Sequence, residues 1–200
     1  TGDKIEKIFK NLKNKKLVDV VSNPEFLREG EAIRDFIYPD RVIIGTDSKK
    51  ANKILKTLYM PIVKKDSRYF NTSRRGAELI KYASNSFLAT KISFINEIAN
   101  LCEKTGVDVK DISLGIGSDQ RIGYRFLRAG PAYGGSCFPK DTRALIDIAD
   151  KFRTNMSIIK SVVSSNNKRK ILLIKKVKSI LNNKLKNKKI TFLGVTFKPN

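Results

Sequence analysis

The sequence predicts an α/β protein in which the end of a parallel sheet is followed by a mostly helical middle. Two short apolar runs of strand type, residues 17–21 and 41–45, are each followed by a segment with helix signals. From about Ser73 to Lys104 there is no proline, and apolar residues recur at helical spacing. Strands that alternate with helices are typical of parallel sheets, and the proline-free run predicts one long helix.

The first strand leads directly into a helix signal. Asn23 precedes Pro24, which is the pattern of a helix cap followed by proline at the first helical position. The predicted helix would carry Glu25 and Glu29 one turn apart on the same face. After the second strand, apolar side chains recur with helical spacing and predict another helix at residues 48–60.

The remaining elements follow Gly106, which we expect to end the long helix. Their signals are the positions of proline and glycine and the spacing of apolar residues. We expect a short helix at about 109–114, an irregular glycine-rich stretch at 115–136, a helix that begins at Pro139, a basic amphipathic helix at about 158–185 and a buried strand at 189–196.

The chain is strongly basic, with 41 Lys and Arg against 19 Asp and Glu and a formal net charge of +22. Such a charge favours polyanions, but the lysines are spread along the whole chain, so we expect a solvated basic surface and no nucleic-acid partner. The apolar stripe of residues 158–185 is expected to pack on a core. No apolar run approaches the roughly 18 residues of a membrane span and no leader is recognisable, which predicts a cytoplasmic protein without membrane contact.

Two cysteines and the absence of histidine limit the chemistry. They exclude a disulfide framework, a zinc site and a nucleophile activated by imidazole, and we expect no metal. Cys102 continues the apolar face of the long helix and is expected in the core. Cys137 lies two residues before Pro139 and beside Lys140, where a helix N-terminus and an ammonium both favour thiolate over thiol. It is therefore the candidate nucleophile.

Two polar pairs stand at i and i+4 on predicted helices. Glu25 and Glu29 could orient a hydroxyl or activate water, although acidic residues in a first helical turn also complement the helix dipole. Lys81 and Asn85 on the long helix could hold a developing oxyanion, although a solvated polar stripe is the default interpretation. No segment has the spacing of a glycine-rich dinucleotide-binding loop.

Several separated motifs occur in the order of one enzyme family. They are SNPEFLREG at 22–30, KYASN at 81–85, DQRIG at 119–123 and AYGGSCFPKD at 132–141. On these motifs the chain resembles the UDP-glucose/GDP-mannose dehydrogenase family over nearly its whole length. The family's N-terminal glycine-rich loop has no counterpart here, so we expect the chain to be part of a longer polypeptide. The resemblance implies the end of a Rossmann-like NAD-binding domain at 1–72, a mostly helical central dimerisation domain at 73–187 and the first strand of a Rossmann-like UDP-binding domain at 188–200.

The resemblance also implies an activity, the oxidation of UDP-glucose to UDP-glucuronate with two NAD molecules in succession. The first hydride leaves C6 of the sugar to give an aldehyde, which the Cys137 thiolate captures as a thiohemiacetal. Loss of a second hydride gives a thioester, which water hydrolyses. GDP-mannose and UDP-N-acetylhexosamine dehydrogenases share this chemistry and are alternatives. From another class, a basic nucleic-acid-binding or dimerisation module is a further alternative.

Finally, the resemblance assigns roles to matching positions. Glu25 would be the base for the hydrolytic water, Lys81 and Asn85 would stabilise oxyanions, and Asp141 would support the water or Lys81. Glu29 and Lys140 would border the nicotinamide. A homodimer built on the long helix would let Arg121 reach the sugar of a neighbouring subunit. Substrate-binding residues would be Glu25, Phe26, Leu27, Arg28, Glu29, Lys81, Asn85, Arg121, Phe126, Leu127, Arg128, Ala129, Gly130, Gly134 and Lys198.

Overall fold

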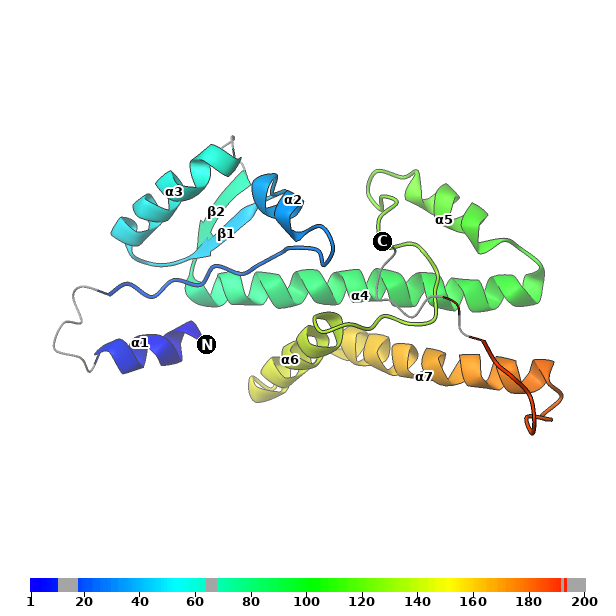
Figure 1. The fold of residues 1–200 in the computed structure, drawn as a ribbon. Coiled ribbons are helices and arrows are strands. Elements are labelled where there is room, and N and C mark those ends of the chain that lie inside the picture. Colours follow the sequence, from blue (N-terminus) through cyan, green and yellow to red (C-terminus); the bar gives the residue numbers. More distant parts are fainter. Residues whose placement is uncertain (11–17, 64–67, 192, 194–200) are drawn as a thin grey trace. The chain divides into compact units, whose positions relative to one another are not determined.

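The computed structural model describes residues 1–10, 18–63, 68–191 and 193 (Figure 1). The chain separates into two compact units, with the boundary between Lys81 and Tyr82 inside one long helix. We call them the N-terminal unit and the C-terminal unit and describe each by itself.

The N-terminal unit is built on a two-stranded parallel sheet. Its elements are α1 (Gly2–Lys10), α2 (Ala32–Ile37), β1 (Val42–Gly45), α3 (Lys49–Val63), β2 (Tyr69–Thr72) and the first turns of α4 (Arg74–Thr105). Strand β1 pairs with β2 in the register Val42↔Tyr69 to Gly45↔Thr72, and α3 connects the two strands and packs on both. A helix that joins two parallel strands is the βαβ unit of α/β folds, so the prediction of an α/β class is confirmed at this level.

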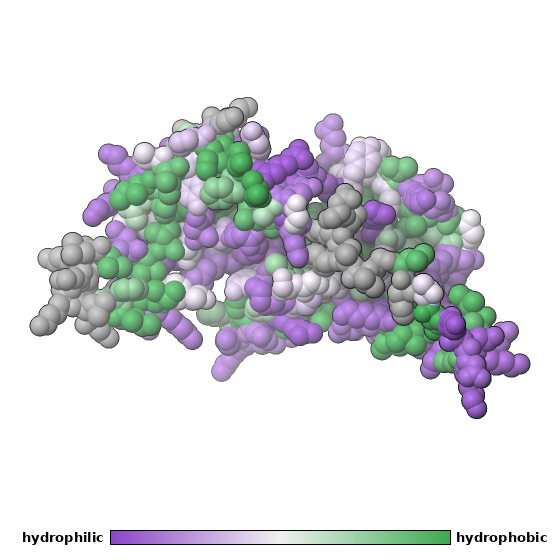
Figure 2. All heavy atoms as spheres, viewed as in Figure 1, coloured by the Kyte–Doolittle hydropathy of each residue, from purple (hydrophilic) through white to green (hydrophobic). Residues whose placement is uncertain are grey.

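The core of the N-terminal unit lies between the sheet and α3. All four residues of β1 are buried, as expected for a strand covered on both faces. Val42, Ile44 and Val63 form the buried cluster, and Leu55 and Tyr59 of α3 pack against it. The opposite side of α3 carries exposed apolar residues, and Figure 2 shows hydrophobic residues on the surface over this helix.

Two predictions for the N-terminal unit are confirmed and two are wrong. The strand at 41–45 and the helix at 48–60 are present as β1 and α3, although α3 continues through Pro61 to Val63. The strand predicted at 17–21 is wrong for its described residues, 18–21, which are irregular. Only Ser22 makes an isolated antiparallel bridge, to Gly45.

The helix predicted to begin at Pro24 is also wrong. Residues 23–28 are irregular, and the next helix, α2, begins only at Ala32. The reason is that the Asn23 side chain is bonded elsewhere and does not cap a helix: it donates to the Ile43 carbonyl at 3.0 Å and accepts from the Tyr59 hydroxyl at 2.6 Å. Glu25 and Glu29 therefore do not share a helix face.

The C-terminal unit is helical among its described residues. It contains the rest of α4, α5 (Val109–Gly117), α6 (Phe138–Lys151) and α7 (Ser157–Ile180), and a long irregular stretch separates α5 from α6. The long helix at 73–104 and the helix after it are confirmed, and Gly106 ends α4 with a positive φ of 73°. Ala89, Tyr133 and Val162 form a buried cluster that joins α4, the loop before α6 and α7.

The end of the chain differs from the prediction. The basic amphipathic helix was expected to reach about residue 185 but stops at Ile180, where Asn182 and Asn183 adopt positive φ angles of 48° and 59°. Of the strand expected at 189–196, the described residues 189–191 and 193 are not in a strand, and the others lie outside the described residues. Among the residues that the structure describes, no helix combines the length and low polarity needed to cross a membrane.

Candidate active site

Cys137 occupies the N-cap position of α6 and its thiol is exposed. Its backbone carbonyl accepts the first helical hydrogen bond, from the Asp141 N–H at 2.9 Å. Pro139 is the second helical residue and has no N–H to leave unpaired. The sulfur therefore sits at the positive end of the helix dipole, as the sequence predicts.

Lys140 adds positive charge beside the cysteine. Its ammonium donates a hydrogen bond to Asp141 Oδ1 at 2.8 Å, and this bond raises the pKa of Lys140, with the nearby Cys137 thiol contributing in the same direction. The Lys140 side chain is 70% exposed.

A buried carboxylate and amide lie beneath Lys140. Asp141 is only 1% exposed and Asn85 is 7% exposed. Asp141 Oδ2 accepts from Asn85 Nδ2 at 2.6 Å, while Oδ1 accepts from Lys140, so both carboxylate oxygens are paired. A buried charge is tolerated only with such partners. The pair fixes the Asn85 amide by one N–H and leaves its second N–H as a donor.

In the N-terminal unit, Lys81 and Glu25 lie together. Lys81 Nζ donates to the Glu25 backbone carbonyl and lies 3.6 Å from the carboxylate oxygen Oε2. The same ammonium lies 5.1 Å from the centre of the Phe26 ring. The Arg41 guanidinium lies 4.3 Å from the centre of the same ring. Glu25 thus has a lysine as a charged neighbour.

Arg28 is bound within the N-terminal unit by two acidic residues. Its guanidinium lies 2.5 Å from Asp35 Oδ1 and 2.8 Å from Glu31 Oε2. The hydrogen bonds from Arg28 hold the pKa of Asp35 below its ordinary value of 3.8. Glu29 lies in the turn that follows Arg28.

Leu27 lies exposed in the irregular segment at 23–28, and most of the other predicted substrate-binding residues lie in the irregular stretch before α6. Arg121 is paired with Asp119 at 2.5 Å and its side chain is 89% exposed. Phe126, with φ of 67°, places its ring edge-on to Phe138 at 6.2 Å. The Leu127 side chain is buried, Ala129 and Gly130 are half-buried, and Arg128 and Gly134 are exposed. Lys198 lies outside the described residues.

A set of polar residues that the sequence does not single out holds this stretch in place. Asn96 on α4 and Asn166 and Arg169 on α7 hydrogen-bond to the backbone of Gly130 and Tyr133. Their only signal in the sequence is a polar side chain at a position where the helix faces the core. No group of His, Cys, Asp and Glu within the described part of the chain could hold a metal ion.

Comparisons with known proteins show the family. The model of the UDP-glucose/GDP-mannose dehydrogenase family NAD binding domain matches residues 1–63, and the model of the same family's central domain matches residues 75–168. The chain belongs to the UDP-glucose/GDP-mannose dehydrogenase family.

The curated relatives are longer than this chain. The chain is 50% identical over 202 residues to the UDP-glucose 6-dehydrogenase of Rhizobium meliloti, with 100% of this chain and 46% of the relative aligned. It is 52% identical over 180 residues to the UDP-glucose 6-dehydrogenase of Rickettsia bellii, with 90% of this chain and 42% of the relative aligned. The chain therefore spans less than half of their length.

Solved structures of nucleotide-sugar dehydrogenases are also similar to this chain. The UDP-glucose dehydrogenase of the hyperthermophilic archaeon Pyrobaculum islandicum matches with a TM-score of 0.78 at 41% identity, covering 82% of this chain and 37% of that one. The UDP-D-ManNAc dehydrogenase of Pyrococcus horikoshii matches with a TM-score of 0.74 at 26% identity, covering 90% and 44%.

Proposed function

We propose that the protein containing this chain oxidises UDP-glucose to UDP-glucuronate with NAD, in the cytoplasm. The observation that carries the proposal is the exposed Cys137 at the N-cap of α6, next to protonated Lys140 and the buried Asn85–Asp141 pair. The names of relatives at 50% and 52% identity support UDP-glucose as the substrate, ahead of GDP-mannose or a UDP-N-acetylhexosamine. The two free thiols fit a reducing compartment.

The chemistry requires a nucleophile that captures an aldehyde and later leaves. Bound NAD supplies the hydride acceptor for both oxidation steps. Cys137 as thiolate adds to the C6 aldehyde and forms a C–S bond, and the resulting thiohemiacetal loses a hydride to become a thioester. Water then cleaves the C–S bond and the thiol returns. The aldehyde stays covalently bound throughout, which explains why the site uses a cysteine.

The chain's other residues would handle charge and protons. Asn85, fixed by Asp141, would donate its second N–H to the oxygen that develops negative charge on C6, together with Lys81. Glu25, whose side chain is 54% exposed and paired with Lys81, would deprotonate the hydrolytic water. Glu29 and Lys140 would border the nicotinamide, and the residues at 26–28, 121, 126–130, 134 and 198 would bind the sugar nucleotide.

A domain organisation and a homodimer belong to the same proposal. The domains are the end of an NAD-binding domain, a central dimerisation domain and the first strand of a UDP-binding domain. The C-terminal unit supports the homodimer, because Phe87, Phe94 and Leu101 on α4 are 65%, 50% and 58% exposed. They recur every seven residues and so form one apolar stripe along the helix, the pattern by which helices pair.

The cysteine assignment can be tested with the two cysteines of the chain. In the protein that contains this chain, Cys137→Ser should abolish net formation of UDP-glucuronate, because a serine alkoxide is far harder to form than a thiolate at neutral pH. Cys102→Ala is the control, since it removes a buried thiol and should cost only about 1 kcal/mol of stability without loss of activity. Product is measured by chromatography, together with the ratio of NADH to acid, expected at two to one. Full turnover by Cys137→Ser would overturn the assignment.

A further inference from the structure

The stretch that leads to Cys137 is held by side chains and not by a strand. The Gly130 N–H donates to Asn96 Oδ1 at 2.8 Å, and the Gly130 carbonyl accepts from Arg169 Nε at 3.1 Å. The Tyr133 N–H donates to Asn166 Oδ1 at 2.8 Å, and Asn166 Nδ2 donates back to the Tyr133 carbonyl at 3.0 Å. Side chains from α4 and α7 thus bind the N–H and carbonyl groups of both Gly130 and Tyr133, and we call this set of four hydrogen bonds the clamp.

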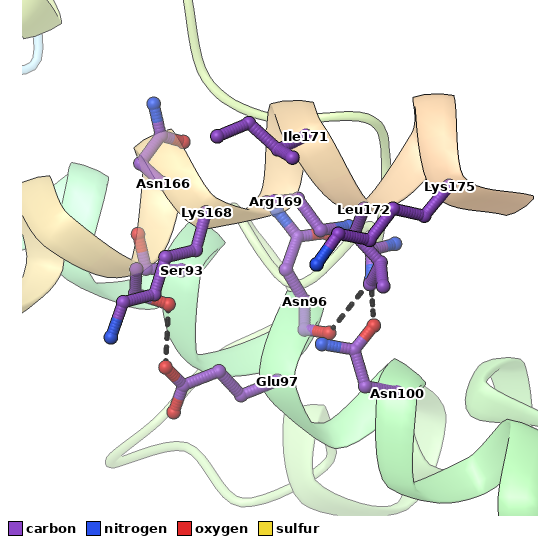
Figure 3. A pocket seen from close by; sticks show the side chains of 11 residues that line it. Ser93, Asn96, Glu97, Asn100, Asn166, Lys168, Arg169, Ile171, Leu172 and Lys175 are labelled. Atoms are coloured by element: carbon purple, nitrogen blue, oxygen red, sulfur yellow. Dashed lines mark hydrogen bonds between the residues drawn. The ribbon is translucent and has the colours of Figure 1, made fainter.

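The Asn166 half of the clamp is buried, because both of its hydrogen bonds to Tyr133 lie away from solvent, while the two bonds to Gly130 are partly buried. Asn96 and Asn166 are 3% and 4% exposed, and Tyr133 is 5% exposed. Arg169 is fixed in turn by the Asn96 carbonyl at 3.2 Å and by the Asn100 side chain, as Figure 3 shows from the side of the α4–α7 groove. A buried backbone group that loses its partner costs more than the bond contributes when made. These side chains therefore hold the loop backbone at Gly130 and Tyr133.

Tyr133 connects the clamp to the helix that carries the thiol. Its ring meets the ring of Phe138, the first residue of α6, edge-on at 6.1 Å and 85°. Both rings pack with Ala89 and Val162 in the buried cluster of the C-terminal unit. Between Tyr133 and Cys137 the chain includes Gly135 with φ of 74°, so the backbone of that short segment is intrinsically permissive.

We infer that Asn166 is a positioning residue for the Cys137 thiol. Asn166 fixes the backbone of Tyr133. The Tyr133 ring contacts Phe138 and so fixes the N-terminus of α6, where Cys137 lies. The expected effect of Asn166 on turnover rests on the proposed function, but its expected effect on the Tyr133 backbone and on the Cys137 thiol does not. Near-attack geometry at the aldehyde carbon depends on the sulfur's position to within fractions of an ångström, which a clamp four residues away can set.

The structural consequence is tested on the chain itself by hydrogen exchange. Asn166→Ala removes both bonds to Tyr133, so the Tyr133 amide should exchange at least about tenfold faster. The amide of Ile95 in the buried middle of α4 should be unchanged, which separates local opening from loss of the fold. Asn166→Asp and Asn167→Asp form a matched pair with the same change of charge at adjacent positions, one buried and one exposed. Only the first should accelerate exchange.

The reactive consequence is measured by alkylation of Cys137 with iodoacetamide, which needs no dehydrogenase activity. Asn166→Ala should slow alkylation about threefold, because the sulfur is then less firmly held at the helix N-terminus, where the thiolate is favoured. Asn167→Asp should alkylate like the native chain. If Tyr133 exchange is unchanged in Asn166→Ala, or if it rises while alkylation stays at the native rate, Asn166 does not position the thiol.

The kinetic consequence is measured in the protein that contains this chain. Asn166→Ala should lower kcat about tenfold or more with KM for UDP-glucose within about twofold, because geometry and not binding is lost. Tyr133→Leu is the second variant: it keeps the backbone bonds but removes the ring contact to Phe138, and it should lower kcat in the same way. An unchanged kcat, or a raised KM alone, overturns the inference. A native protein that does not oxidise UDP-glucose overturns the proposed function instead, and exchange and alkylation then decide the role of Asn166.

Discussion

Some polar and charged side chains in this chain are held by partners that are distant in sequence. Asp141 in the first turn of α6 binds Asn85 of α4, 56 residues earlier in the sequence. The neighbouring Lys140 and the cysteine before it were visible as a local motif, since helix start signals, a thiol and a lysine fall within four positions. The arrangement around Cys137 was thus predictable because its residues are adjacent in sequence. The buried Asn85–Asp141 pair was not predictable, because its members are far apart in sequence.

The Arg28–Asp35 ion pair predicts a loss of stability in acid. Because hydrogen bonds from Arg28 lower the pKa of Asp35 in the folded chain, the pair stabilises the fold fully above the ordinary carboxyl pKa of 3.8. That contribution is lost as the pH falls below this value toward the lowered pKa. Thermal unfolding followed by circular dichroism from about pH 5 to 2 should show a shallower decline for Asp35→Asn than for the native chain.

The control for this measurement is Asp47→Asn, which removes an exposed carboxylate elsewhere in the N-terminal unit. Its melting temperature should follow the native pH profile. A native and an Asp35→Asn profile that run in parallel would show that Asp35 is not tied to Arg28 in solution.

At the scale of elements, boundaries were predictable where a side chain caps a helix. Ser48 and Ser73 accept from the N–H groups of Ala51 and Gly76, each at 3.1 Å, and so open α3 and α4 where the periodicity suggested. Asn23 has the same capping chemistry but uses it on Ile43 and Tyr59, distant in sequence. The prediction failed there because a tertiary contact outweighed a local signal.

Two glycines test packing between elements. A Cβ on Gly45 at the end of β1 would lie 2.6 Å from Ala77 Cβ and 2.8 Å from Arg74 Cα, and the backbone of α4 cannot move aside cheaply. Gly45→Ala should therefore lower the free energy of unfolding by about 1–3 kcal/mol, as overpacking does.

Gly115 offers the matched substitution. It lies inside α5 with nothing within 4 Å of a Cβ, so Gly115→Ala should raise stability by about 0.5–1 kcal/mol through the loss of unfolded-state entropy. Urea titrations of both variants measure the difference. Equal effects of the two substitutions would contradict the close approach of β1 to α4.

At the scale of the whole molecule, the exposed stripe on α4 predicts self-association. Phe94→Glu places a charge in the middle of Phe87, Phe94 and Leu101 and should raise the dimer dissociation constant at least about tenfold, as loss of a central aromatic contact does. Leu114→Glu on α5 is the control, because Leu114 is 62% exposed but lies outside the stripe. Sedimentation velocity across concentrations gives the constants, and equal values for both variants would place the dimer interface elsewhere.

The central claim is that Cys137 carries the substrate as a thioester, and Glu25→Gln tests it most directly. The substitution keeps most of the shape and hydrogen bonding of Glu25 but removes the base, so hydride transfer should proceed while hydrolysis stalls. Rapid mixing of the protein that contains this chain with UDP-glucose and NAD should give a fast burst of NADH, then a slow steady state, and an acyl adduct on the peptide that contains Cys137 in the mass spectrum. A burst without an adduct on Cys137 would contradict the thioester. The absence of both burst and adduct would show that Glu25 acts before the thioester forms.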